Sequence, residues 1–579
     1  MTGAEVTRAA VRLALGGAPG GDGLPSGGDL PAEAAAAVVA LLAVNKVSLL
    51  ALRAEDDGSD SVRAALLASP AAGAAIDSAR ARRRGLLDAY RPVAGAMADA
   101  GIRPVLFKSP AAFPYLSSNL DVLVPPSRFE ESARIVADLG HIRFPHYRED
   151  HKLLFRAFER GRPGLSLHLH EAISWGRVLV AGGDAVAARA VAGEEAWLLV
   201  SSPADALTAT LAHTILETDE VRLSDLRTVR RCLAHGARVA DFLAEAKERR
   251  WEAAAASSLL LYDAVCRTAG ARGLLDAEDR ERAGEALARS TWARRSLRRV
   301  VPGGEMTLPH RTPRWFSKGH LVALIAGDDR RDPDRKLKDL IASGWNLVAN
   351  RLAIRCRPAQ LITISGPDGA GKSRLAASVA ETLRLCEVPV ARLWSRGGFS
   401  RLAVSGKALA RHVAGGRIPA VRDEEAKREF LETGWRRTLW TWTVVIEQAA
   451  SLQRARLALA AGRTVVCDRY AYDSLADLLS RSPQGGRALP ARAAGFLLGA
   501  APAPDIALLI DVDAEVAHER KEDGTTLESR RRLAGAYRAV VDAAPFVRLD
   551  GNLSFDELAQ QAIEVTVRRT FDAFAKDRA

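Results

Sequence analysis

The feature that most constrains this chain is a glycine-rich stretch, Gly366–Ser373, in the second half of the sequence. Apolar and β-branched residues before it, Leu361–Ser365, predict a buried strand, and residues 373–383 after it predict a helix. A glycine, four further residues and then Gly-Lys-Ser, set between a strand and a helix, form the pattern of a phosphate-binding loop. The sequence therefore predicts that the chain binds a nucleoside triphosphate.

The residue types of this loop suggest separate roles. Glycines allow backbone N–H groups to converge on phosphate oxygens, and the positive end of the helix dipole adds to the attraction. We expect Lys372 to reach the outer phosphates and the Ser373 hydroxyl to bind Mg²⁺, so ATP and Mg²⁺ are the expected cofactors. The expected nucleotide contacts are Gly366, Asp368, Gly369, Ala370, Gly371, Lys372, Ser373 and Arg374.

Length and cysteine usage favour a multidomain protein of a reducing compartment. A chain of 579 residues has room for two to four domains. Its five cysteines are scattered without a CxxC pair, which argues against a disulfide framework or a zinc site of that type. We expect no secretory signal, because the first residues lack a basic region followed by an apolar core. The longest apolar run, Ala34–Val44, is too short to span a bilayer. We expect a cytoplasmic protein with no membrane partner.

The net charge of +12 raises the question of a nucleic-acid partner. The basic residues are dispersed, mainly as arginine, and no basic block is interleaved with aromatic residues. Charge alone supports only non-specific association, so we do not expect nucleic acid to be the partner. A small phosphorylated acceptor would use the same arginines. The sequence does not indicate an oligomeric state.

Composition and periodicity divide the chain into four parts. Residues 1–30 are rich in glycine and alanine and are expected to form a flexible N-terminus. Residues 31–300 predict an α+β and helical domain, and 301–358 predict a linker followed by a connecting helix. We expect that helix to dock on the next domain, although binding of a separate partner is the alternative. Residues 359–579 alternate strands and helices.

The N-terminal domain contains three short predicted strands separated by helices. The strands are Arg103–Lys108, Asp121–Val124 and Leu165–His170, and a long helix is expected over Pro31–Arg53. Another helix is expected over 127–139, where a serine followed three residues later by a glutamate suggests a capping box.

These strands carry a pattern that resembles the minimal nucleotidyltransferase superfamily, over about residues 35–240. The matching runs are Val105-Leu106-Phe107-Lys108, Leu120-Asp121-Val122-Leu123-Val124 and His168-Leu169-His170. The resemblance implies two carboxylates one residue apart that hold Mg²⁺, completed by a third. Here Asn119 takes the first position, Asp121 the second and His168 the third.

An amide and an imidazole are poor ligands for a hard cation, so we expect a nucleotidyltransferase-like domain without transfer activity. Its degenerate site would comprise Lys108, Asn119 and Asp121. Glu171 is a candidate for the missing carboxylate. His168 and His170 lie two residues apart on one strand and would share a face, either as a metal-binding pair or as structural histidines.

The C-terminal part predicts a doubly wound parallel sheet with helices on both faces, so the expected fold class is α/β, joined to the N-terminal α+β domain. Its further strands are expected at Val388–Trp394, Thr464–Cys467, Ile506–Ile510 and Phe546–Leu549. Asp468-Arg469-Tyr470 directly follows one of them. In such sheets the site lies at the carboxyl ends of the strands.

The loop, Asp468-Arg469-Tyr470 and the later arginines together resemble the thymidylate kinase family of nucleoside monophosphate kinases, over about residues 359–575. The resemblance implies that Asp468 holds the metal through water and that Arg469 clamps the acceptor phosphate. Arg520 and one of Arg530 or Arg531 would close as a lid that excludes water. Asp368 would face the sugar of the acceptor, and Arg396 and Tyr470 would complete the acceptor site.

The sequence stretches expected to bind the acceptor differ from those of that family. The Tyr-Gln expected after the motif has become Asp477-Leu478, and the stretch expected after the second strand is reduced to Ser395–Gly398. From the resemblance we expect an ATP-dependent kinase with dTMP as the first candidate acceptor, and these departures leave other acceptors open. The alternatives are a kinase for another phosphorylated or sugar metabolite, and an ATP-dependent switch that controls the N-terminal domain.

Overall fold

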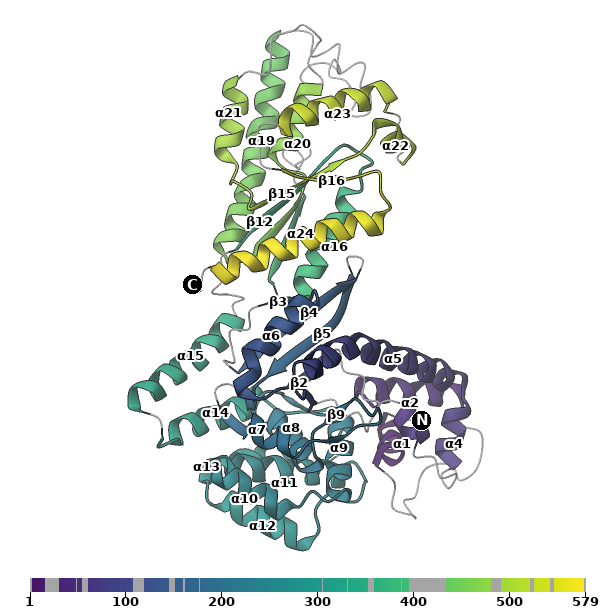
Figure 1. Cartoon of the computed structure of the whole chain (residues 1–579), viewed down its shortest axis with the longest axis vertical. Helices are drawn as coiled ribbons and strands as arrows, with labels where there is room; N and C mark the ends of the chain where they lie inside the picture. Colours follow the sequence, from purple (N-terminus) through teal and green to yellow (C-terminus); the bar gives the residue numbers. More distant parts are fainter. Residues whose placement is uncertain are drawn as a thin grey trace. The chain divides into compact units, whose positions relative to one another are not determined.

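The structure is a computed structural model of the whole chain that divides into two compact units. The first comprises Met1–Ala157 and Leu165–Asn346, and the second comprises Phe158–Gly164 and Leu347–Ala579. The residues that the structure describes are 3–15, 31–47, 49–54, 61–107, 119–144, 151–159, 162–175, 178–304, 306–330, 332–351, 359–386, 388–394, 434–480, 491–520, 525–541 and 546–576. Each unit mixes helices and strands, as an α/β architecture requires (Figure 1).

The first unit is built on a seven-stranded mixed sheet of order β3-β4-β5-β2-β1-β9-β8. Its strands are β1 (Val105–Leu106), β2 (Leu120–Leu123), β3 (Ile142–Phe144), β4 (Lys152–Glu159), β5 (Arg162–His170), β8 (Val191–Ala192) and β9 (Leu199–Val200). Strands β2 and β5 run parallel, whereas β1 and β2 are antiparallel. The three strands expected from the sequence are therefore neighbours at the centre of this sheet. Two small sheets accompany it, formed by β6 (Ala172–Trp175) with β7 (Val178–Gly182) and by β10 (Glu220–Val221) with β11 (His310–Arg311).

One face of the central sheet is apolar because alternate residues of its strands point to it. Leu120 and Val122 of β2 join Leu165, Leu167 and Leu169 of β5 in one buried cluster. Side chains from α5 (Pro70–Asp99) and α6 (Phe129–Asp138) complete this cluster, so these two helices cover that face. The residues between the leucines consequently face the opposite side of the sheet.

Helices form the rest of the first unit. They are α1 (Gly3–Leu15), α2 (Ala32–Val44), α3 (Leu49–Ala54), α4 (Ser61–Ala68), η1 (Pro126–Arg128), α7 (Gly183–Ala188), α8 (Pro203–Leu216), α9 (Leu223–Ala234), α10 (Val239–Glu248), α11 (Glu252–Thr268), α12 (Ala277–Ala288), α13 (Thr291–Val300), α14 (Arg314–Gly327) and α15 (Pro333–Arg351). The single helix expected over Pro31–Arg53 is interrupted where Lys46 adopts a φ of 56°, which divides it into α2 and α3. The expected capping box at Ser127 was wrong, because α6 begins after Arg128 and has no side-chain cap.

Three expectations concern the ends of this unit. Residues 3–15, expected to belong to a flexible N-terminus, form α1, whose apolar residues at helical spacing are buried in the core. The glycine-rich residues 16–30 lie outside the described residues. The prolines of 301–313 do not end the unit, because β11 pairs with β10 and α14 buries Phe316 and Ile325 in the same core. Leu340 of the expected connecting helix packs against that core as well, while its docking on the next domain stays a prediction.

The second unit contains a five-stranded, all-parallel sheet of order β13-β14-β12-β15-β16. The strands are β12 (Leu361–Ser365), β13 (Val390–Trp394), β14 (Thr464–Asp468), β15 (Ile506–Asp511) and β16 (Phe546–Asp550). All five expected strands are confirmed, with bounds that differ by two residues or fewer. The strand that leads into the glycine-rich loop lies at the centre, flanked by β14 and β15.

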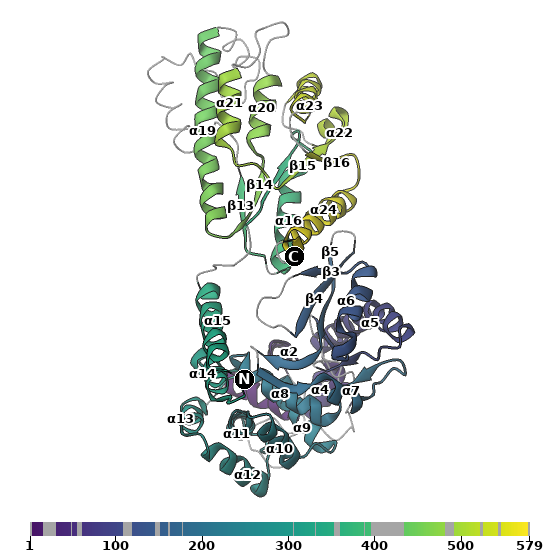
Figure 2. The ribbon, with the colours of Figure 1, turned by 60° about the vertical axis from the view of Figure 1, so that its left-hand side comes forward.

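Helices cover both faces of this sheet, as a doubly wound fold requires. They are α16 (Lys372–Leu385), α19 (Gly434–Ala460), α20 (Ala471–Ser480), α21 (Ala491–Ala500), α22 (Ala514–Glu519), α23 (Leu527–Val541) and α24 (Phe555–Lys576). Figure 2 shows α16 and α24 on one side of the sheet and α19 and α21 on the other. The insertion expected from about residue 397 to 430 lies outside the described residues.

Two further observations bear on the expectations from composition. Cys232, Cys266, Cys386 and Cys467 are buried and free of disulfide bonds, whereas Cys356 lies outside the described residues. Among the helices that the structure describes, none combines the length and the apolar character that crossing a membrane demands.

Candidate functional site

The glycine-rich loop joins the carboxyl end of β12 to the first turn of α16, in the setting that the sequence predicts. Gly366, Gly369 and Gly371 have φ values of 150°, 93° and 87°, a region that favours glycine. A Cβ on Gly366 would lie 2.8 Å from the carbonyl oxygen of Ile510, and one on Gly369 would lie 2.5 Å from that of Ala517. The loop is therefore folded tightly against β15 and α22, and only glycine fits at these two positions.

Lys372 is buried at the start of α16, with 5% of its surface exposed. Its Nζ donates to the carbonyl oxygens of Gly366 and Pro367, at 2.7 Å each, and lies 3.5 Å from Asp368 Oδ1. The pKa of Lys372 is lowered from 10.5 to about 8, mainly by burial and also by neighbouring Arg469, while the carboxylates of Asp368, Asp473 and Asp468 oppose the shift. The ammonium group is thus held inside the loop by two backbone carbonyl oxygens.

Asp368 and Arg469 form an ion pair beside Lys372. Burial alone would lower the pKa of Arg469, but the carboxylates of Asp368 and Asp473 raise it above its ordinary value. Arg469 adopts a φ of 73°, which is uncommon for a residue with a side chain, while its N–H donates to the carbonyl oxygen of Ile364. The strained backbone and the ion pair together direct this arginine toward the loop.

Asp468 is the last residue of β14 and pairs in register with Ile364 of β12. It is 6% exposed, and its Oδ1 finds no hydrogen-bond partner among the residues that the structure describes. A buried carboxylate oxygen without a donor is costly unless a cation or water satisfies it. Ser373, the other expected metal ligand, is exposed at the start of α16. Both residues therefore fit a hard cation bound through oxygen atoms.

Asp473 is a buried residue of this region to which the sequence analysis assigned no site role. Its Oδ2 accepts from Ser365 Oγ at 2.6 Å and from the Tyr470 N–H at 2.8 Å, and its Oδ1 accepts from the Tyr537 hydroxyl at 2.7 Å. Burial and the Asp473 carboxylate raise the pKa of Tyr537 well above its ordinary value. This network ties β12, α20 and α23 together behind the loop, and only the spatial approach of three distant segments could show it.

The three candidate lid arginines take different positions. Arg530 is buried and its Nη1 donates to the Asp368 carbonyl oxygen at 2.9 Å, so it reaches the loop. Arg531 instead forms an exposed ion pair with Glu515. Arg520 donates to the carbonyl oxygens of the turn after β16, with Nη1 2.6 Å from Gly551 O. The structure thus brings Arg530, but not Arg520 or Arg531, to the glycine-rich loop.

The remaining expected nucleotide and acceptor residues are less directly placed. Tyr470 is fully buried and its hydroxyl donates to the Pro502 carbonyl oxygen, so a contact with an acceptor stays a prediction. Arg374 is exposed, with its guanidinium 3.7 Å from the ring centroid of Phe555. Ala370 is buried in the loop. Arg396 lies outside the described residues.

In the first unit, the nucleotidyltransferase-like residues converge on one face of the central sheet. Asp121 and His168 are in register on β2 and β5, and Asn119 Nδ2 lies 2.8 Å from His168 Nδ1. Glu171, the candidate for a missing carboxylate, contacts Nδ1 of His151 through its Oε1 instead. Lys108 lies outside the described residues. The sequence predicted the shared face of the histidines but did not predict that His170 also approaches Asp121.

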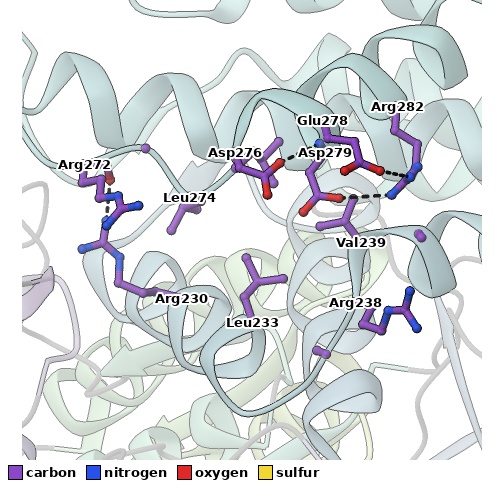
Figure 3. A pocket seen from close by; sticks show the side chains of 14 residues that line it. Arg230, Leu233, Arg238, Val239, Arg272, Leu274, Asp276, Glu278, Asp279 and Arg282 are labelled. Carbon is purple, nitrogen blue, oxygen red and sulfur yellow. Dashed lines mark hydrogen bonds and ion pairs between the residues drawn. The ribbon is translucent and has the colours of Figure 1, made fainter.

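A hollow of about 600 Å³ is lined by α9, α10, α12 and residues 272–276, which precede α12 (Figure 3). Several of its charged side chains contact one another or the backbone. Arg282 pairs with Glu278 and Asp279, and Arg230 donates to the Arg272 carbonyl oxygen. None of the residues that the sequence motifs single out lines this hollow.

Known proteins match the chain in two ways. Residues 35–267 match the model of a family described as uncharacterised nucleotidyltransferase, in agreement with the pattern found in that region. A thymidylate kinase from Ruegeria pomeroyi is 30% identical over 223 residues, which cover 36% of this chain and 93% of that relative. The two resemblances expected from the motifs are thus supported by independent similarity.

Proposed function

The chain belongs to the thymidylate kinase family, and from that relationship we propose that its second unit transfers the γ-phosphoryl group of ATP to a nucleoside monophosphate, with dTMP as the first candidate. The observation that carries this proposal is the convergence of Lys372, Arg469 and Asp468 on the glycine-rich loop. Two cations and a buried carboxylate at the end of β14 match the demands of moving a phosphoryl group between two anions.

On the donor side, the loop would hold the triphosphate of ATP. Backbone N–H groups at the start of α16 and the Lys372 ammonium would donate to phosphate oxygens, in place of the carbonyls that the ammonium contacts now. Ser373 and the unsatisfied oxygen of Asp468 are the groups that would hold Mg²⁺, which supplies charge neutralisation when it is bound.

On the acceptor side, Arg469 would hold the acceptor phosphate. Its planar guanidinium can donate two parallel hydrogen bonds to a phosphate. In the structure one of its terminal nitrogens donates to Asp368 Oδ1. The ion pair with Asp368 keeps the arginine in place until an acceptor competes for it. Arg530, which already contacts the loop through the Asp368 carbonyl, would add positive charge near the transferred group.

A second candidate function is an ATP-dependent switch, which would bind ATP through the same residues but would not transfer phosphate to an acceptor. It is supported by the departures on the acceptor side, since Asp477-Leu478 replaces the expected Tyr-Gln and Asp473 is committed to a buried network. A kinase for another phosphorylated or sugar metabolite is compatible with the same departures. A kinase and a switch differ in whether ATP turnover depends on a small-molecule acceptor.

The deciding experiment measures ADP formation from ATP with a panel of acceptors that includes dTMP, other nucleoside monophosphates, nucleosides and sugars. We expect acceptor-dependent ADP formation that falls by about 100-fold or more in Lys372→Ala, since a buried donor to the developing charge is lost. Arg469→Ala should lose acceptor-dependent turnover while keeping ATP binding. Arg568→Ala removes an exposed arginine paired with Glu564 and should match the wild type.

The results of this panel distinguish the candidate functions. Turnover that requires a nucleoside monophosphate supports the proposal, and preference among the monophosphates tests dTMP. ATP binding with slow hydrolysis that no acceptor stimulates would reject the kinase in favour of the switch.

A further inference from the structure

We propose that Asp121, His168 and His170 bind a divalent transition-metal ion of the Zn²⁺ class, at a site with one open coordination position. The site lies in the first unit and does not depend on the kinase activity proposed for the second. It differs in chemistry from the Mg²⁺ site that the nucleotidyltransferase-like pattern implies, because two of its three ligands are imidazole nitrogens.

The sheet brings these three side chains to one face for a simple geometric reason. Leu120 and Val122 of β2, and the leucines of β5, point into the apolar cluster under α5 and α6. Because successive residues of a strand alternate between faces, Asp121, His168 and His170 point to the other side. The parallel register that sets Asp121 opposite His168 and Leu123 opposite His170 then places the carboxylate between the two imidazoles.

The distances are those of a compact ligand set. His170 Nε2 lies 3.0 Å and His168 Nδ1 lies 3.2 Å from the same Asp121 oxygen, Oδ1. One ligand atom from each residue lies within 4.8 Å of those of the other two. Zinc ligands at bond lengths of about 2.0–2.2 Å are separated by less than that, so the cluster needs little movement to close around an ion.

The polar contacts of His168 place its ring beside the proposed ion. Asn119 Nδ2 lies 2.8 Å from His168 Nδ1 and 3.2 Å from His168 Nε2. His168 Nδ1 also lies 3.2 Å from Asp121 Oδ1. A neutral imidazole offers one nitrogen lone pair, which a cation between His168 and Asp121 would use.

Ligand chemistry selects the class of metal. Mg²⁺ requires oxygen ligands in near-octahedral geometry, whereas imidazole nitrogen suits Zn²⁺ and its neighbours in the first transition series. Two histidines and one carboxylate leave a fourth position for water or another ligand, as catalytic zinc sites do. The side chain of His168 is 17% exposed, which gives an ion access, while those of Asp121 and His170 are buried.

The surroundings hold at least one ligand in position. The ring of His170 packs edge-on against Phe107, with ring centroids 4.8 Å apart. The backbone of His170 is fixed as well, because its carbonyl oxygen accepts from the Val124 N–H at 2.9 Å. A ring held from two directions loses little freedom on binding an ion, which raises affinity.

The test uses the full-length protein, stripped of metal with a chelator and titrated with Zn²⁺ by calorimetry in the presence of excess Mg²⁺. We expect one Zn²⁺ per chain, undiminished by Mg²⁺. Asp121→Asn and His170→Gln should each lower the Zn²⁺ affinity by more than about 100-fold, because loss of a ligand costs more than loss of an outer hydrogen bond. His235→Ala, at an exposed histidine after α9, should bind Zn²⁺ as the wild type does.

A second measurement on the wild type keeps the proposal testable if a buried substitution prevents folding. Co²⁺ bound at the same stoichiometry should give absorption bands of a four- or five-coordinate site, and X-ray absorption should show nitrogen and oxygen neighbours without sulfur. Absence of a stoichiometric Zn²⁺ site, sulfur ligation, or equal affinity in wild type and Asp121→Asn would each overturn the proposal. The histidines would then be a hydrogen-bonded structural pair.

Discussion

At the scale of single residues, both candidate sites depend on polar groups that folding has removed from water. Lys372 is buried against two carbonyl oxygens, and Asp468 retains an oxygen without a donor among the described residues. Such groups lower the stability of the fold unless a ligand satisfies them, so they are usually found where a ligand binds. Asp473 shows the contrast, because each of its oxygens has a hydroxyl or N–H donor.

The pKa of Lys372 leads to a prediction about stability and pH. In the folded chain the pKa is about 8, below the ordinary 10.5, so between these values the unfolded chain binds a proton that the folded chain lacks. Stability must therefore rise with pH across this window, and the destabilising effect is fully present below pH 8. In Lys372→Met the side chain at this position cannot titrate. The unfolding free energy of the wild type minus that of the variant should therefore increase from pH 7.5 to 9.5.

Between the folded and unfolded pKa values the unfolding free energy should change by about 3 kcal/mol at most. The interval from pH 7.5 to 9.5 covers part of that pH range. Urea unfolding of both proteins at the two pH values provides the comparison, and titrations shared by the two proteins cancel in the difference. A difference that stays constant or decreases with pH would show that Lys372 keeps its ordinary pKa in the folded chain.

At the scale of elements, the glycine-rich loop depends on close backbone contacts as much as on its charged residues. Gly369 has a positive φ, and a side chain there would collide with the Ala517 carbonyl oxygen on α22. Gly366 has the same relation to β15. The loop therefore keeps its shape because neighbouring elements approach it more closely than a methyl group allows.

Gly369→Ala should lower the unfolding free energy by about 1–3 kcal/mol and weaken ATP binding, since the N–H groups of the loop must shift. Gly495→Ala makes the same chemical change on the exposed face of α21, where a Cβ meets open space. It should stabilise the chain by up to about 1 kcal/mol. Urea unfolding and ATP titration measure both effects, and equal behaviour of the two variants would refute the argument.

At the scale of the whole molecule, the chain contains separate hydrophobic cores. The largest cluster draws its buried residues from Ala9 to Ile325, and the cluster around the parallel sheet draws them from Leu361 to Val540, with no residue in common. Each of these cores belongs to one compact unit. Units with separate cores can unfold in separate steps, and a ligand stabilises only the step that destroys its site.

Calorimetric unfolding of the full chain should therefore show two transitions. ATP with Mg²⁺ at 100 times its dissociation constant should stabilise one of them by about 2.7 kcal/mol and leave the other in place. A fragment of residues 347–579 should show the ATP-sensitive transition alone. A single transition that ATP shifts as a whole, or a fragment that does not bind ATP, would show that the units do not fold independently.

Much of the second unit could be predicted because its signals are local. Four of the five strands of its sheet end in a polar residue, as Thr464–Asp468 does. The spacing of Gly366, Gly371 and Lys372 specifies the loop. The first unit was harder, because its sheet pairs segments whose patterns are weak. Helix α1 was missed because the glycines that follow it obscured a short helical repeat of alanine and leucine.

The sequence by itself determined where the glycine-rich loop lies, the parallel sheet behind it, and the residue types at both candidate sites, since strand alternation and loop spacing are properties of neighbouring residues. Only the tertiary structure decided that Arg530 is the candidate lid arginine that reaches the loop. It also decided that Asp473 accepts hydrogen bonds from Ser365 and Tyr537, and that Asp121 lies between His168 and His170. These contacts join residues 47 to 162 positions apart. Packing of whole elements brings such residues together, and no local pattern in the chain records it.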